Sequence, residues 1–485
     1  MGQDNKYIFD IDSFDEKSNV DARELRRRKH KKSRVLSWVF FILFICIIAA
    51  GAVYGISRVM KPQGGEETAT SEQVESISSV DSVIENLTDD EEEIIVTPPE
   101  ETETEPTEEE LFTEAVRAYV DAIPLEDKVA GVFLITPEAL TDVGTVVQAG
   151  EGTKTALSEY AVGGLIYSAK NMTSKEAFIQ MLSNTAEYSK YPLFLAVNEE
   201  LGNTTFSNAM GVTDTMTAKE VGDTADSSMA YLEEEKIAKY MSECGLNLNL
   251  GIVCEPYIEK TAADDDSDET DDESRYFSAD VTLNDSLTEK AISALHEYGV
   301  DAAVKFFPGE SSGNADTENG LSTTERTKEE MLASELSSFK NAVLNGADMV
   351  IVSHESAPSL TGDSTQCSLS KAVMTDLLRV ELELDDVIVI TDSLSKAAIS
   401  SYYESGEAAV MAIKAGADMI MCPEDFKTAY TAVLEAVNKG VISKDRITDS
   451  LVRIYSVKFK GLTADEVNAY TEQLISETDS VSENE

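Results

Sequence analysis

Short apolar runs alternate with stretches of helical periodicity between about residues 111 and 462. Eight of these runs predict β-strands, at residues 129–136, 162–167, 193–197, 246–253, 301–307, 349–353, 387–391 and 419–421. They are nearly continuous in Val, Ile and Leu, which is typical of strands covered on both faces. Apolar residues at helical spacing predict helices between them, for example at 177–188, 287–298, 328–345 and 406–415.

The alternation of strand and helix predicts a parallel sheet. Eight strand–helix repeats fit a (β/α)8 barrel of the TIM type, so residues 111–462 are predicted to form one α/β domain. A doubly wound open sheet has the same alternation, and the pattern alone leaves that alternative open.

A second apolar pattern lies near the start of the chain. Residues 35–57 carry no charge, and a bilayer core takes about 20 helical residues to cross. The preceding residues 26–34 are almost all Lys or Arg, which predicts that residues 1–34 are a cytoplasmic tail and that the rest of the chain is extracytoplasmic. The alternative is a cleaved signal peptide, but the 34-residue leader is long for one. We therefore predict a single-pass protein of the cell membrane.

Residues 58–110 are rich in Glu, Thr, Ser and Pro and are predicted to be a disordered acidic linker. Residues 463–485 form an acidic C-terminal tail, predicted to be disordered from about residue 472. The formal net charge of the chain is −52, which argues against a nucleic-acid partner, because phosphate binding needs a basic surface.

Metal and redox chemistry have little support in the sequence. The chain has three histidines and five cysteines without CxxC spacing, and we expect the cysteines outside the apolar segment to be buried small hydrophobes. A disulfide between Cys244 and Cys254 stays possible. The acidic run 264–273 could collect calcium, but it lacks the spacing of an EF-hand loop, so a solvated insertion is favoured. No cofactor is implied.

Carboxylates follow several of the predicted strands, which is where the chemistry of a barrel gathers. They are Glu199, Glu200, Glu310, Asp316, Glu318, Glu355 and Asp392. Two opposed carboxyl groups across a cleft are what glycoside hydrolysis requires, one as acid and the other as nucleophile or base. The alternative is that acidic residues are abundant here and must lie somewhere.

One of these strand ends resembles a known family. Residues 303–309 resemble the KHFPGHGD segment of glycoside hydrolase family three, in its bacterial β-N-acetylglucosaminidase branch. Other segments match in order: 125–129 resembles the opening of that barrel domain, 162–167 its GGxILF strand, 245–249 its GINxNxAPV strand, 275–278 its RSF turn, 346–354 its GADxVMxAH strand, 389–394 its VxSDxL strand and 415–421 its AGADxLLxP strand.

The resemblance implies a retaining hydrolase that releases terminal N-acetylglucosamine, with Asp392 as the nucleophile. It implies that Lys305, Arg275 and His354 help to hold the sugar. The alternatives are that Asp392 caps the next helix and that His354 is bonded within the barrel. His296 lies within a predicted helix and is expected to be structural.

The chain departs from the family pattern at the site itself. Phe306 stands where the family has the His after Lys, and Glu310 stands at its second His. The family's acid/base His aligns with Glu318, beside a retained Asp316, so Glu318 is the candidate acid with Asp316 as its partner. Asn198 replaces the sugar-binding Asp of the DQEGG strand end and is the candidate donor to a hydroxyl.

Two functions follow from these observations. The first is a membrane-anchored exo-β-N-acetylglucosaminidase acting on cell-envelope glycans or peptidoglycan fragments. The second is a catalytically inactive barrel that binds an envelope glycan or a protein partner, which the departures at the site motivate. An active retaining site predicts that the carboxyls of Asp392 and Glu318 face each other about 5–5.5 Å apart.

Overall fold

The computed structural model describes residues 106–202, 205–259 and 273–482. The predicted cytoplasmic tail, the apolar segment 35–57 and nearly all of the predicted linker lie outside these residues, as does most of the acidic run 264–273. Residues 106–485 belong to one compact unit. No helix among the described residues is long and apolar enough to span a membrane.

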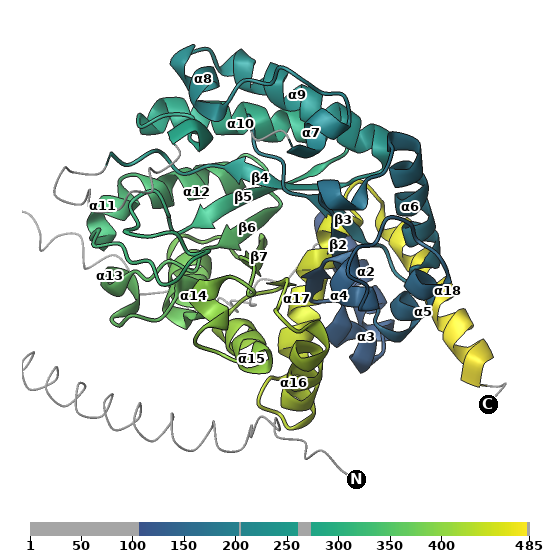
Figure 1. The fold of residues 1–485 in the computed structure, drawn as a ribbon. Coiled ribbons are helices and arrows are strands. Elements are labelled where there is room, and N and C mark those ends of the chain that lie inside the picture. Colours follow the sequence, from purple (N-terminus) through teal and green to yellow (C-terminus); the bar gives the residue numbers. More distant parts are fainter. Residues whose placement is uncertain (1–105, 203–204, 260–272, 483–485) are drawn as a thin grey trace, which may run out of the picture. The chain divides into compact units, whose positions relative to one another are not determined.

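Eight parallel strands form one sheet (Figure 1). They are β1 Phe133–Ile135, β2 Gly164–Ile166, β3 Phe194–Val197, β4 Leu248–Val253, β5 Asp301–Phe307, β6 Met349–Val352, β7 Ile388–Thr391 and β8 Ile420–Met421. Their order is β7-β6-β5-β4-β3-β2-β1-β8, and a parallel bridge between Ile390 and Met419 brings β7 against β8. The (β/α)8 prediction is confirmed, and the open-sheet alternative is wrong.

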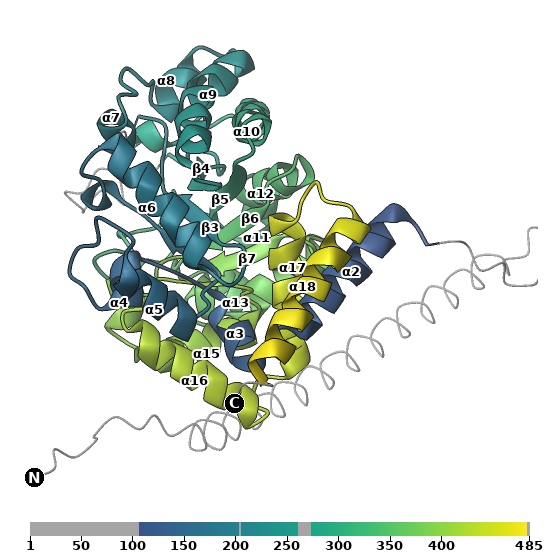
Figure 2. The same cartoon turned by 90° about the vertical axis from the view of Figure 1, so that its right-hand side faces the viewer.

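Helices surround the strands in both views (Figures 1 and 2). They are α2 Glu108–Ala122, α3 Leu125–Ala130, α4 Pro137–Thr141, α5 Glu151–Glu159, α6 Lys175–Tyr188, α7 Thr205–Ala209, α8 Ala218–Asp223, α9 Ser227–Cys244, α10 Val281–Glu297, α11 Lys328–Leu332, α12 Glu335–Leu344, α13 Pro358–Thr361, α14 Ala397–Ser400, α15 Ser405–Ala415, α16 Phe426–Asn438, α17 Lys444–Lys458 and α18 Ala464–Ser482. A π-helix, Ala372–Glu381, precedes β7.

All eight predicted strands are present, but the first is shorter than predicted. Residues 125–130 form helix α3, in which Val129 and Ala130 are buried, so β1 begins only at Phe133. Close packing fixes the next strand: β1 and β2 pair Leu134 with Gly164, where an added Cβ would lie 2.6 Å from the carbonyl oxygen of Phe194. Only glycine fits this contact.

The two ends of the domain also differ from the predictions. Helix α2 begins at Glu108, inside the predicted linker, because Thr107 and Glu110 form a capping box. The C-terminal region predicted to be disordered from residue 472 is instead helix α18, which runs to Ser482 and packs against α2. The prediction was wrong because Val467 and Leu474 give this acidic helix a buried apolar face.

The end of the barrel opposite the carboxyl ends of the strands is held by buried ion pairs. Asp418, just before β8, is fully buried and accepts from Arg379, from Arg446 at 3.4 Å and from Arg453 at 3.3 Å. The same carboxylate accepts the backbone N–H of Val389 in β7 at 3.0 Å. Asp418 therefore joins β7 to two helices outside the barrel, the π-helix that carries Arg379 and the helix α17 that carries Arg446 and Arg453.

His296 is also bonded at this end, to Asp348 at 2.8 Å just before β6. This contact agrees with its predicted structural role. The described cysteines Cys244, Cys254, Cys367 and Cys422 are all free thiols, and no disulfide joins Cys244 to Cys254. Three of the four are buried, as predicted, and Cys422 is half-buried.

We expect Asp418→Asn to lower the free energy of unfolding by about 3–5 kcal/mol, because three arginines would lose a buried counter-charge. Denaturant unfolding measures this change. Glu243→Gln is the control, since Glu243 makes only a surface pair with Lys175 and its loss should leave the stability essentially unchanged. Equal stability of the two variants would contradict the role given to Asp418.

Candidate active site

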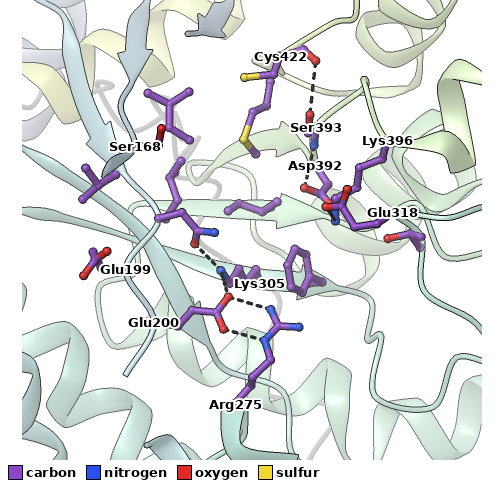
Figure 3. A pocket seen from close by; sticks show the side chains of 18 of the residues that line it. Ser168, Glu199, Glu200, Arg275, Lys305, Glu318, Asp392, Ser393, Lys396 and Cys422 are labelled. Carbon is purple, nitrogen blue, oxygen red and sulfur yellow. Dashed lines mark hydrogen bonds and ion pairs between the residues drawn. The ribbon is translucent and has the colours of Figure 1, made fainter. Parts of the chain in front are cut away.

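A pocket of about 1230 Å³ opens at the carboxyl ends of the strands. Six of the predicted site residues line it: Asn198, Arg275, Lys305, Asp316, Glu318 and Asp392. Figure 3 shows two groups of side chains in this pocket, with Glu200, Arg275 and Lys305 in one and Asp392, Lys396 and Glu318 in the other. His354 is the one predicted residue that does not line it.

Glu200 organises the first group. Its carboxylate takes two hydrogen bonds from Arg275, at 2.7 and 2.8 Å, and pairs with Lys305 at 2.5 Å. Lys305 also donates to Asn198 Oδ1 at 2.6 Å. Burial alone would raise the pKa of Glu200, but the charges of Lys305 and Arg275 outweigh it and lower the pKa to about 2. The group is therefore a buried, internally paired set of charges.

Asp392 follows β7, and its backbone N–H donates to the carbonyl of Val352 at 2.9 Å. One carboxylate oxygen accepts the N–H of Ser393 at 2.7 Å, and the other pairs with Lys396 at 2.7 Å. Burial would raise the pKa of Asp392, but the nearby ammonium of Lys396, helped by the backbone hydrogen bond from Ser393 and other neighbours, outweighs it, so the pKa lies below its usual value. The carboxylate is held ionised, which a nucleophile requires.

Lys396 connects Asp392 to the loop after β5. Its ammonium lies 2.7 Å from Asp392 Oδ2 and 3.2 Å from Glu318 Oε1, so these two oxygens lie within about 6 Å of each other. Burial lowers the pKa of Lys396, but the charges of Asp392 and Glu310 outweigh that effect and raise it. Lys396 is thus a permanent cation between two carboxylates.

Phe306 lies at the centre of the cations in the pocket. The charged groups of Lys305, Lys396 and Arg275 lie 5.1, 5.3 and 5.5 Å from its ring centroid. Distances of this order are those of cation–π attraction. From the sequence, Phe306 was expected only to remove a histidine contact, whereas in the structure its ring lies among three cations of the site.

His354 lies outside the pocket lining and is fully buried. Its Nδ1 lies 2.7 Å from the hydroxyl of Ser368, and its Nε2 lies 2.8 Å from the carbonyl oxygen of Ser393. A carbonyl only accepts, so Nε2 carries the proton and Nδ1 accepts from Ser368. These contacts match the alternative, a histidine bonded within the barrel, and a contact of His354 with the sugar stays a prediction.

Glu318 and Asp316 lie on the loop between β5 and α11, and both are exposed. Asp316 Oδ1 accepts the backbone N–H of Glu318 at 2.8 Å, so it shapes the loop rather than bonding the carboxyl of Glu318. Lys396, Glu200 and Glu310 had no predicted role in the site. The spacing of Asp392 and Lys396, four residues apart, is the one signal in the sequence that could have pointed to Lys396.

The family assignment rests on a family model, the glycosyl hydrolase family 3 N terminal domain, which matches residues 101–457. The chain belongs to glycosyl hydrolase family 3. Among its relatives is beta-hexosaminidase A of Pseudoalteromonas piscicida, 24% identical over 332 residues, which are 63% of this chain and 54% of that relative. The chain thus spans about half the length of that protein.

Beta-hexosaminidase LpqI of Mycobacterium tuberculosis is 26% identical over 340 residues, 68% of this chain and 82% of that relative. Among solved structures, a family 3 beta-N-acetylglucosaminidase from Paenibacillus sp. str. FPU-7 superposes with a TM-score of 0.61 at 26% identity. The superposition covers 73% of this chain and 68% of that one. The family 3 resemblance seen in the sequence is therefore confirmed, and the chain is a β-hexosaminidase-like glycosyl hydrolase.

The Glu200 network predicts a pH-dependent stability. The pKa of Glu200 is depressed in the folded state, so its contribution is complete above the unfolded value of about 4.5 and is lost as the pH falls toward 2. A difference of this size corresponds to about 3 kcal/mol. Glu200→Gln should therefore be less stable than the wild type at pH 7 by about that amount, with the gap closing toward pH 2.

Urea unfolding of both proteins between pH 7 and pH 2 measures the gap directly. A gap that stays constant across that range would contradict the ion-pair origin of the effect.

Proposed function

We propose that the protein is a retaining exo-β-N-acetylhexosaminidase that removes terminal N-acetylglucosamine. The observation that carries the proposal is the state of Asp392, a buried, ionised carboxylate at a strand end of a family 3 barrel. A retaining mechanism also needs a second carboxyl about 5–5.5 Å away. Glu310 and Glu318 both line the pocket with Asp392, and Glu318 Oε1 lies within about 6 Å of Asp392 Oδ2.

In this mechanism Asp392 attacks the anomeric carbon and forms a covalent glycosyl-enzyme, which water then hydrolyses. A carboxyl group on the other side of the bond protonates the leaving oxygen and later activates the water. One oxygen of Asp392 pairs with Lys396 and the other accepts the N–H of Ser393, so the orientation of the nucleophile is fixed before the substrate enters.

The first group of side chains supplies the contacts that would orient the sugar. Asn198, Lys305 and Arg275 present hydrogen-bond donors along one side of the pocket, and Glu200 fixes their positions. Groups held in place before the substrate binds lose little freedom during the reaction, which favours turnover.

We also propose that this site acts outside the cell, on cell-envelope glycans or peptidoglycan fragments. The support for this comes from the sequence alone, through the apolar segment 35–57 and the basic residues 26–34 before it. The acidic residues 58–105 would then give the barrel reach from the membrane.

One observation favours a second function, a barrel that binds without catalysis. The cations of the pocket are already paired: Glu200 engages Lys305 and Arg275, and Asp392 engages Lys396. Such a site could hold a glycan or a protein partner and never form the covalent intermediate.

The deciding experiment is hydrolysis of 4-nitrophenyl N-acetyl-β-glucosaminide and of muropeptides by the full-length protein. We expect wild-type turnover and a loss of at least about 10³-fold in Asp392→Asn, because that variant has no nucleophile. Asp449→Asn is the matched control, since Asp449 makes only a surface pair with Arg117. A folded wild type that turns over neither substrate would leave the binding function.

Lys396 yields a pH prediction. Because its ammonium lowers the pKa of Asp392, Lys396→Met should raise that pKa, and the nucleophile should become protonated at a higher pH. The acidic limb of the kcat/KM profile is therefore expected to move to higher pH in the variant. An unmoved acidic limb would show that this limb does not report Asp392.

A further inference from the structure

Glu310 is a pocket carboxyl that the family pattern does not explain. It lies three residues after the end of β5, lines the pocket and is half-buried. Its Oε1 accepts from the hydroxyls of Ser353 at 2.6 Å and Thr317 at 3.3 Å. No residue of the described part of the chain donates a hydrogen bond to Oε2, so that oxygen is available to a ligand in the pocket.

Neighbouring strand ends place Glu310 beside Asp392. Ser353 is the first residue after β6, and its N–H donates to the carbonyl of Phe307 in β5 at 2.8 Å. The residue before it, Val352, accepts the N–H of Asp392 at 2.9 Å. Glu310, Ser353 and Asp392 therefore lie in a row across β5, β6 and β7, with the Ser353 hydroxyl directed to the glutamate.

The backbone of Glu310 is fixed from below. The fully buried carboxyl of Glu255 accepts the N–H of Glu310 at 3.0 and 2.9 Å and that of Ser311 at 3.1 Å. A side chain that rests on such a support keeps its place during a reaction, as a proton-transferring group must. By contrast, the Glu318 side chain is 61% exposed on the loop, where it pairs with Lys396.

The charges around Glu310 suit a proton donor. Burial raises the pKa of Glu310, and the negative charge of Asp392 raises it further. The positive charges of Lys396 and Arg275 lower it, but the net result is a raised pKa. The buried Glu255 lies below it and is a further acidic neighbour. The pKa of Asp392 is shifted in the opposite direction. Two carboxyls whose pKa values are pushed apart in one pocket divide into an acid and a nucleophile.

We propose that Glu310, rather than Glu318, is the catalytic acid/base of this site. The inference rests on the proposed glycosidase function. In the first step Asp392 forms a bond to the anomeric carbon, the bond from that carbon to the leaving oxygen breaks, and the proton on Glu310 goes to that oxygen. In the second step the Glu310 carboxylate takes a proton from water, the water oxygen bonds to the anomeric carbon, and Asp392 is released.

The test compares two substrates that differ in their need for a proton. The nitrophenolate of 4-nitrophenyl N-acetyl-β-glucosaminide can leave without being protonated. The sugar that leaves from N,N′-diacetylchitobiose needs a proton on its oxygen. In the full-length protein, Glu310→Gln should lower kcat/KM for chitobiose by at least about 100-fold and for the nitrophenyl glycoside by less than about tenfold. The basic limb of the chitobiose pH profile should disappear, and azide should restore nitrophenyl turnover with a glycosyl azide as product.

Glu318→Gln tests the rival residue, and Glu325→Gln is the matched control, an exposed glutamate of the same loop that does not line the pocket. Two outcomes would overturn the assignment and leave the glycosidase function standing. One is a loss of kcat/KM in Glu318→Gln that is larger for chitobiose than for the nitrophenyl glycoside. The other is an equal loss of kcat/KM on both substrates in Glu310→Gln. A wild type without turnover on either substrate would remove both. Thermal unfolding of each variant verifies that it is folded.

Discussion

The barrel closes through the contact between β7 and β8, and the buried carboxylate of Asp418 stabilises that contact. β7 and β8 share a single parallel bridge, and Asp418 reinforces it by accepting the N–H of Val389 while three arginines neutralise its charge. Asp392 follows β7 and Cys422 follows β8, so both flank the pocket as a consequence of this closure. Asp418, at one end of the barrel, therefore helps to hold together the two strands that lead to Asp392 and Cys422 at the other end.

The site carries a different electrostatic character from the strongly acidic chain around it. Arg275, Lys305 and Lys396 gather on one aromatic ring, and each is matched to a carboxylate. Paired in this way, the charges do not create a field that attracts a particular ion; they fix one another's positions. Recognition of an uncharged sugar through hydrogen bonds fits such a pocket better than attraction of a charged ligand does.

The strands and the barrel could be predicted because apolar runs alternate with helices. The start of β1 was misjudged, because Val129 and Ala130 are apolar and continue into the strand pattern, yet they form the buried end of α3. Asp392, Lys305 and Arg275 were found through strand ends and family segments. Lys396, Glu200 and Glu310 were given no role, and the bonds of His354 within the barrel were left as an alternative, because pairing across the pocket depends on side-chain direction, which periodicity does not encode. Helix α18 was missed because its charge outweighs the few apolar residues that pack on α2.

The pairing of α2 with α18 has a mechanical consequence. The first and last described helices pack against each other (Figure 2). Tyr119 of α2 meets Phe459, which in turn stacks on Tyr470 of α18. Any force that reaches the domain through its N-terminal end is therefore shared between two helices before it reaches a strand.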